Sequence, residues 1–98
     1  MAERQILLSA IPFQIVNAMV NGQSYRITVR QNGGKIFTSL MVDGVQVTDN
    51  VMAREGAPIV PFSQTTARTI PYWVDLQGRE PPQYEGLGSR WLLCYEAE

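Results

Sequence analysis

The chain has 98 residues, of which 45% are hydrophobic and 17% charged, as is usual for one soluble globular domain. Eight basic side chains nearly balance nine acidic ones, so no electrostatic footprint exists for nucleic acid or for an anionic membrane. The single cysteine, Cys94, excludes an internal disulfide framework.

Residues 1–20 are apolar enough to suggest a signal peptide, but their pattern does not fit one. Glu3 stands beside Arg4 where a basic region belongs, and Pro12, Gln14 and Asn17 interrupt the apolar segment. No stretch approaches the ~20 uninterrupted apolar residues of a membrane-spanning helix. We therefore expect an intracellular, soluble protein with no membrane partner.

Residues 13–48 alternate with the period of two that is typical of β-strands. Three turn signals divide them: Asn21-Gly22, Asn32-Gly33-Gly34 and Asp43-Gly44. Asn21-Gly22 suits a type I′ turn because both positions tolerate positive φ, and it pairs Val20 with Gln23. The second turn uses either Asn32-Gly33 or Gly33-Gly34. The pattern predicts a four-stranded antiparallel meander.

The two choices for the second turn leave the same side chains together, because moving the turn by one residue shifts the strand partner by two. All three turns therefore agree on one face, which we expect to be the core. Its members are Val16, Ala18, Val20, Tyr25, Ile27, Val29, Ile36, Thr38, Leu40, Val42, Val45 and Val47.

The opposite face mixes large apolar side chains with cations, whereas a plain solvent face is polar. It carries Phe13, Ile15, Met19, Arg26, Thr28, Arg30, Lys35, Phe37, Met41, Gln46 and Thr48. One interpretation is that the rest of the chain folds over part of it and closes a barrel or sandwich. The other is that it docks on another protein, since interfaces favour aromatic, Met and Arg residues. The contact surface would then consist of Phe13, Ile15, Met19, Arg26, Arg30, Phe37 and Met41.

The second half of the chain is richer in loops. Gly56, Pro58 and Pro61 predict a loop with at most a short strand around Ile59-Val60. The last segment, RWLLCYE, is apolar on both faces and predicts a central or covered strand.

The segment RTIPYWVDLQG also alternates, with Ile70, Tyr72, Val74 and Leu76 expected on one side. Pro71 lacks an N–H for a ladder bond, which places this strand at an edge or a bulge. We expect a single all-β domain over residues 1–98, a small antiparallel barrel- or sandwich-like fold of six or seven strands. An N-terminal strand and the meander would occupy residues 1–49, and loop-rich closing strands residues 50–98.

The candidate chemistry is sparse. Without a histidine, the chain has no Ser-His or Cys-His pair and no His-containing zinc site. Cys94 lies in an apolar strand, where thiols are inert core groups, and Glu80 and Glu85 are typical of surface charges rather than an acid/base pair. We expect no enzymatic activity, no cofactor and no metal.

Nucleic-acid binding is a weaker alternative. Small β-barrels stack bases on aromatic side chains, and Phe37 or Tyr25 with Arg26 and Arg30 could serve that purpose. Tyr25, however, is predicted to face the core, and the cations are too few to follow several phosphates.

Four motifs point further. They are Ile6, Leu8, Ile11, Pro12 and Gln14; Gly22, Gln23, Tyr25 and Ile27; Asp43 and Gly44; and Leu87, Gly88, Arg90, Trp91 and Leu93. In length and in these motifs nearly the whole chain resembles the family of small bacteriophage baseplate plug proteins first seen in a cyanophage tail. Phe13 and Ile36-Phe37 depart from the family pattern.

The resemblance implies an all-β structural protein of a contractile-tailed phage, present in several copies at the baseplate centre and assembled in the host cytoplasm. It would plug or seal the axial region by packing against other baseplate, tube or hub proteins, with no nucleic acid involved. Replacing Phe37 with aspartate would then abolish incorporation into tails without unfolding the protein. A tail assembly chaperone, which would bind the same partners but be absent from the virion, stays open.

Overall fold

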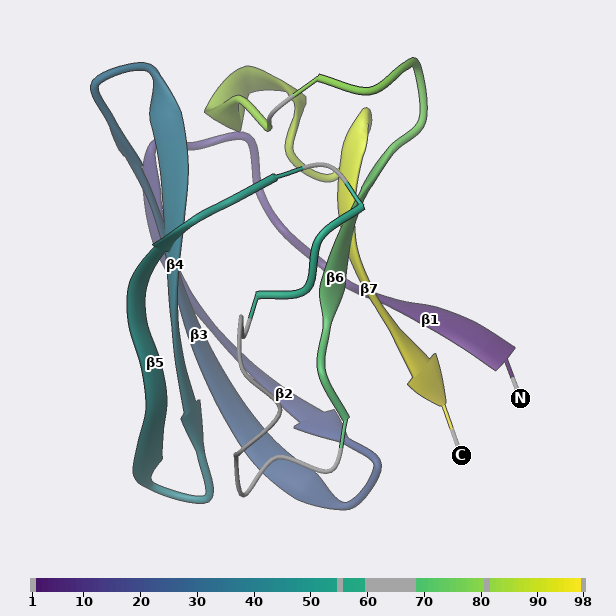
Figure 1. Cartoon of the computed structure of the whole chain (residues 1–98). Helices are drawn as coiled ribbons and strands as arrows, with labels where there is room; N and C mark the ends of the chain where they lie inside the picture. Colours follow the sequence, from purple (N-terminus) through teal and green to yellow (C-terminus); the bar gives the residue numbers. More distant parts are fainter. Residues whose placement is uncertain (1, 55, 60–68, 81, 98) are drawn as a thin grey trace.

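Two antiparallel sheets face each other in the computed structural model, which describes residues 2–54, 56–59, 69–80 and 82–97 (Figure 1). One sheet has the order β2-β3-β4-β5 and the other the order β1-β7-β6. The strands are β1 (Ala2–Ile6), β2 (Phe13–Val20), β3 (Gln23–Asn32), β4 (Lys35–Val42), β5 (Val45–Met52), β6 (Tyr72–Asp75) and β7 (Trp91–Ala97), with a 3₁₀ turn η1 (Tyr84–Gly86) before β7. Neither sheet closes on itself, so the fold is sandwich-like.

The four-stranded meander predicted from the turn signals is confirmed. Val20 pairs with Gln23 across the first turn, where Asn21 and Gly22 have φ values of 48° and 85°. Asn32 pairs with Lys35, so the second turn consists of Gly33-Gly34. Local turn chemistry therefore decides the register of three strands before any distant contact forms.

The inner face of the meander forms the core with the second sheet, as expected. Its fully buried members are Val20, Tyr25, Ile27, Val29, Ile36, Thr38, Leu40 and Val42. From the second sheet come Ile6, Trp73, Trp91 and Leu93. The Tyr25 hydroxyl donates to the Thr69 carbonyl at 2.5 Å, which ties the meander to the segment before β6. Val45 was expected in this core, but it is 53% exposed because it begins an edge strand directly after the turn.

The register of β5 departs from the predicted alternation. Met41 pairs with Gln46 as expected, but Leu40 then pairs with Thr48, so a bulge lies between them. Thr48 therefore shares the side of Leu40, and its predicted place on the outer face is wrong. A second register shift lies between Thr38 and Leu40. Side-chain hydrogen bonds favour it, since the Ser39 hydroxyl donates to Asp49 and accepts from the Asn50 N–H, each at 2.9 Å.

The second sheet confirms two expectations. β7 is its central strand, and β6 lies at its edge directly after Pro71. The outer side of β6 is covered by residues 56–59, because the Gly56 N–H donates to the Trp73 carbonyl at 2.8 Å and the Trp73 N–H to Ala57 at 3.2 Å. The predicted short strand near Ile59 is reduced to one bridge between Pro58 and Tyr72, and Val60 lies outside the described residues.

The side of β6 that faces the core is the one opposite to Tyr72, Val74 and Leu76. Trp73 is 1% exposed and points into the core, whereas Tyr72 and Val74 are half-buried and Leu76 is 58% exposed. The alternation along β6 is compatible with burial of either face. The face that carries Trp73 has the largest apolar surface, so it gains most from burial. Asp75 shares the Trp73 face because an arginine partner compensates its desolvation.

Candidate functional site

The outer face of the meander is open to solvent. Cross-strand pairing arranges its side chains in rows. Two rows span all four strands: Phe13, Arg30, Phe37 and Met52 form one, and Asn17, Arg26, Met41 and Gln46 the other. The exposed fractions are 55% for Phe13, 45% for Ile15 and 67% for Met19. Arg26 and Arg30 are exposed, and Phe37 and Met41 are half-buried.

All seven side chains expected in a contact surface thus lie on this one face. The described part of the second sheet packs on the opposite side of the meander and does not cover this face. We call the set Phe13, Ile15, Met19, Arg26, Arg30, Phe37 and Met41 the outer patch.

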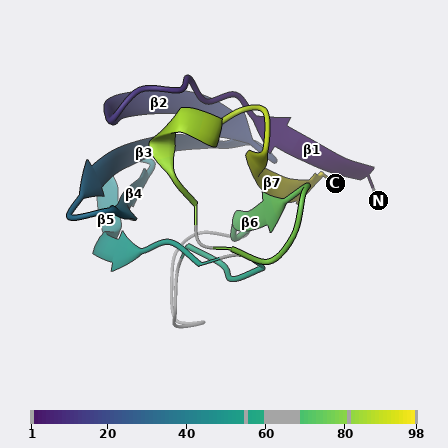
Figure 2. The ribbon, with the colours of Figure 1, turned by 90° about the horizontal axis from the view of Figure 1, so that it is seen from above.

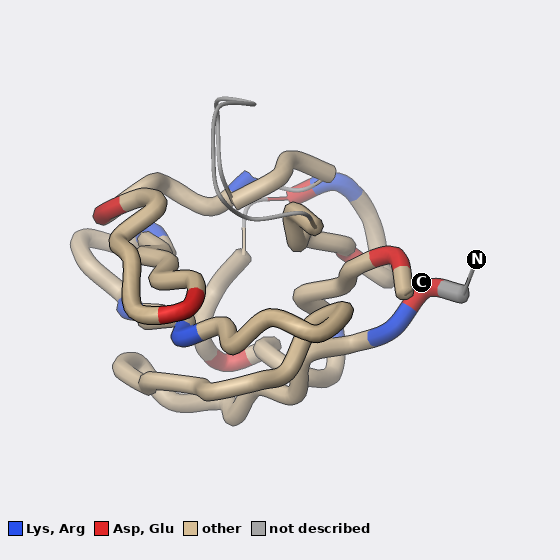
Figure 3. Tube along the Cα trace, turned by 90° about the horizontal axis from the view of Figure 1, so that it is seen from below, with Lys and Arg blue, Asp and Glu red and all other residues tan. Residues whose placement is uncertain are grey.

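The two arginines of the outer patch differ in their surroundings. The Arg30 guanidinium donates two hydrogen bonds to the Asn50 side-chain oxygen, at 3.1 and 2.7 Å, which orients it on the surface. The Arg26 guanidinium has no hydrogen bond or ion pair with any residue that the structure describes. Charges of both signs are scattered around the chain, while β2 carries none (Figure 3). The patch therefore combines an apolar area with one oriented and one unengaged cation.

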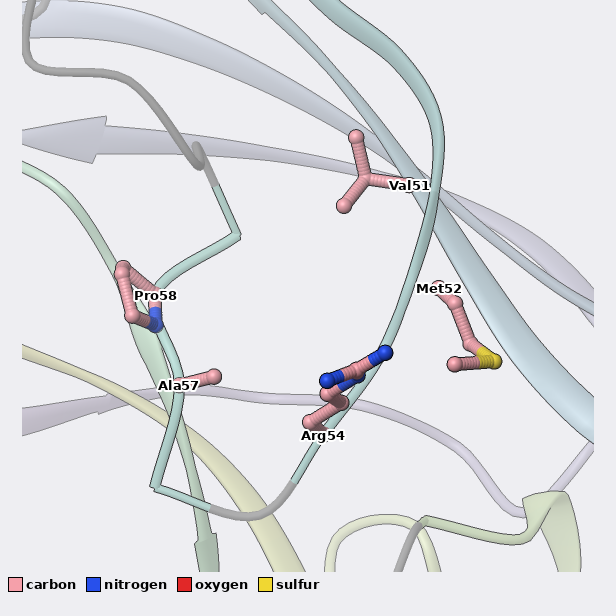
Figure 4. Close-up of a pocket in the computed structure, with 5 residues that line it drawn as sticks. All are labelled: Val51, Met52, Arg54, Ala57 and Pro58. Atoms are coloured by element: carbon pink, nitrogen blue, oxygen red, sulfur yellow. The ribbon is translucent and has the colours of Figure 1, made fainter.

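An open cleft of about 390 Å³ adjoins the patch at the end of β5 (Figure 4). It is lined by Val51, Met52, Arg54, Ala57 and Pro58. Met52 pairs with Phe37 across the strands, so the cleft continues the row that contains Arg30. Its apolar walls and single cation, Arg54, are suited to an apolar partner side chain next to a carboxylate, and these five residues include no nucleophile or general base.

The residues considered for chemistry do not come together. Cys94 is buried, and burial followed by the nearby Glu3 raises the pKa of its thiol, which keeps it protonated and unreactive at neutral pH. Glu85 is exposed in η1, whereas Glu80 accepts a hydrogen bond from Arg90. Among the described residues no group of three or more His, Cys, Asp or Glu side chains is placed to hold a metal ion.

A polar network that sequence analysis missed lies beside the last turn. Asp75 accepts from the Arg90 guanidinium at 2.8 and 3.0 Å and from the backbone N–H groups of Gln77 and Glu80 at 2.9 and 3.0 Å. The guanidinium also lies 4.3 Å from the centre of the Trp91 ring. These contacts fasten β6 to the turn before β7, so the network is structural. An aspartate on the buried side of a strand was the signal that it needed a cation.

Comparison with known proteins identifies the family. The family described as cyanophage baseplate Pam3 plug gp18 matches residues 3–98. The chain belongs to this family. No curated protein sequence matches it. The resemblance seen in the motifs is thereby confirmed, and the chain is a structural component of a bacteriophage tail baseplate that interacts with other baseplate components. No helix among the described residues is long and apolar enough to cross a membrane.

The motifs of this plug protein have structural roles. Gln14 exchanges two hydrogen bonds with the backbone of Ser9, at 2.9 and 2.7 Å, and fixes the segment that joins the two sheets. Leu87 and Leu93 are buried, and Arg90 holds Asp75. The motifs therefore specify the fold of the plug domain, while the outer patch consists largely of residues outside them.

The Asp75 network predicts how the stability of the plug protein depends on pH. Hydrogen bonds from Arg90 first, and then from two backbone N–H groups, hold the pKa of the Asp75 carboxyl far below its usual range. Because the folded-state pKa is depressed, this contribution is present above the unfolded aspartate pKa of about 4 and is lost as the pH falls below it. Asp75→Asn should lower the free energy of unfolding at pH 7 and flatten its fall in acid.

Urea unfolding at pH 7 and at about pH 3 measures both effects. Glu85→Gln, at an exposed carboxylate in η1, is the matched control and should keep the wild-type pH dependence. An Asp75→Asn variant whose stability still falls in acid as steeply as that of the wild type would contradict the assignment.

Proposed function

We propose that the chain plugs or seals the central tube or hub region of a contractile-tail baseplate, with the outer patch as its contact surface. The observation that carries this proposal is the open face on which Phe13, Ile15 and Met19 are about half or more exposed, in a family of baseplate plug proteins. Apolar and aromatic side chains of this kind are the usual anchors of an interface, because partner binding removes them from water.

The polar members of the patch add specificity to this contact. Arg30 is already oriented by Asn50, so a partner carboxylate meets a guanidinium that has little freedom left to lose. Arg26 is available to a second acidic group, since it has no partner among the described residues. The partner surface is therefore expected to be apolar, with one carboxylate facing Arg30 and a second acidic group facing Arg26.

The function needs no chemistry. We propose a mechanical role in which several copies, assembled in the host cytoplasm, are held in place by shape and side-chain packing. The membership of the chain in a structural family supports this role, as does the cleft beside Met52, which could receive a side chain from the same partner.

Quantitative mass spectrometry of purified tailed particles tests the proposal. We expect the protein in clean particles at a few copies per particle, counted against the tube protein. Its absence from clean particles, together with its presence in the lysate, would overturn the plug function and favour a tail assembly chaperone. Salt-dependent binding to single-stranded oligonucleotides would instead support the nucleic-acid alternative.

A further inference from the structure

The four outermost strands of the two sheets differ in how they are protected against pairing. Natural proteins blunt exposed strand edges with charges, bulges or covering segments. β1 carries Glu3 and Arg4, β5 is interrupted by register shifts, and β6 is covered by residues 56–59. β2 has eight residues, FQIVNAMV, with no charge, proline, glycine or bulge. Of the described edges, β2 alone is long, regular and unprotected. Figure 2 shows it as the outermost strand of its sheet, followed by β3, β4 and β5.

The backbone groups along this edge can be assigned. In an antiparallel hairpin with a two-residue turn, Val20 and Gln23 exchange hydrogen bonds, and every second pair along the strands does the same. The bond from the Gln31 N–H to the Pro12 carbonyl, at 2.7 Å, continues this alternation. The N–H and C=O groups of Phe13, Ile15, Asn17 and Met19 therefore point away from β3, toward solvent.

We propose that β2 pairs in antiparallel fashion with β2 of a second copy of the chain. A two-fold axis at Val16 places Phe13 opposite Met19 of the second copy and Ile15 opposite its Asn17, so that every outward backbone group on the edge gains a partner. No like charges meet, because the strand is uncharged.

Side chains at the same edge favour this occupant. A shallow hollow of about 160 Å³, lined by Asn17, Ala18, Met19 and Ser24, lies at the end of β2 that receives Phe13 of the second copy. Phe13 and Met19, at 55% and 67% exposure, would cover each other twice in the symmetric pair. The edge thus complements itself in backbone bonds, in charge and in apolar surface.

The pairing stands on the edge itself and does not rest on the proposed plug function. It would join two meanders into one continuous sheet and extend the outer patch across both copies. Arg26 and Arg30, on the next strand, stay on its surface and available to a baseplate partner.

Asn17→Pro tests the proposal, with Asn17→Thr as its matched control. Proline removes an N–H that makes no bond within the sheet, and edge strands tolerate it, so the fold should survive. We expect wild type and Asn17→Thr to be dimers by light scattering after gel filtration, and Asn17→Pro to dissociate with a Kd raised roughly tenfold or more. A monomeric wild type at all concentrations, or an Asn17→Pro dimer of unchanged affinity, would overturn the pairing.

Amide hydrogen exchange of the wild type supplies a readout that needs no variant. Phe13, Ile15, Asn17 and Met19 should exchange slowly in concentrated and fast in dilute protein, because their N–H groups are bonded only in the pair. Val16 and Ala18 donate to β3 and should be slow in both. Concentration-independent fast exchange at the four edge amides would refute the proposal even if every variant failed to fold.

Discussion

Replacing Phe13 with aspartate should reduce incorporation of the protein into tails by roughly tenfold or more, with little change in the stability of the isolated chain. Phe13 is 55% exposed, so its ring contributes little to the core, but it begins the row that contains Arg30 and Phe37. An aspartate there removes apolar contact area and places a carboxylate opposite Arg30, which competes with a partner carboxylate for that cation. Particles assembled with each variant, quantified by mass spectrometry, give the result.

Val45→Asp is the matched control. Val45 is 53% exposed and also on an edge strand, but it lies on the inner side of the meander, away from the outer patch. If Val45→Asp is incorporated normally and Phe13→Asp is not, the effect belongs to the outer patch. If both variants lose incorporation equally, a charge anywhere on the meander interferes with incorporation, and this would contradict the assignment.

Two further variants separate the outer patch from its neighbours. Phe37→Asp should also fail to incorporate, but Phe37 is half-buried, so unfolding of the isolated variant would mean that Phe37 belongs to the core. Arg26→Glu changes the patch one strand away from the β2 edge, and it should lose incorporation while keeping any β2 pairing. Loss of both properties in Arg26→Glu would show that the two surfaces are not independent.

Gly88→Ala should destabilise the protein by about 2–5 kcal/mol, since it combines backbone strain with a steric overlap. Gly88 has a φ of +85°, and a Cβ there would lie 2.5 Å from the Leu8 carbonyl oxygen, on the segment that joins β1 to β2. Because that obstacle is backbone, it cannot rotate away and the segment itself has to move.

Gly44→Ala measures the backbone strain alone, so its difference from Gly88→Ala gives the steric part of the effect. Gly44 has nearly the same φ, +82°, but nothing lies within 4 Å of a Cβ placed there. It should lose only the cost of the left-handed conformation, about 1–2 kcal/mol. Each kcal/mol lowers the melting temperature of a domain of this size by ~4–8 °C, so thermal unfolding resolves the difference. Equal losses in the two variants would show that the contact with Leu8 is unimportant.

The meander was predictable because its information is local. Each turn is specified by neighbouring residues such as Asn21-Gly22, and a two-residue turn fixes the pairing of both flanking strands. The outer patch followed from that register, since all its members lie at alternate positions on β2, β3 and β4 that face the same side. The open state of this face could not be predicted, because it depends on which side the second sheet covers.

The features that were missed depend on distant or side-chain interactions. The register shift between Thr38 and Leu40 involves the Ser39 hydroxyl, which donates to Asp49 and accepts from the Asn50 N–H. No alternation pattern encodes these bonds. The buried face of β6 is decided by Trp73 packing into a core made of strands far away in sequence. The position of Asp75 requires Arg90, which is brought beside it only by the pairing of β6 with β7.

The pairing of the first strand with the last bears on the order in which the protein folds. β1 pairs only with β7, from Ala2 opposite Ala97 to Ile6 opposite Leu93, so its contacts span almost the whole chain. The meander needs only contacts between neighbouring hairpins, for which closing the chain costs little entropy. During synthesis the four-stranded sheet can form while β7 is still in the ribosome, and its apolar inner face then lacks the cover that β1, β7 and β6 supply. The slow, committing step of folding is therefore expected to be the arrival of the C-terminal strand.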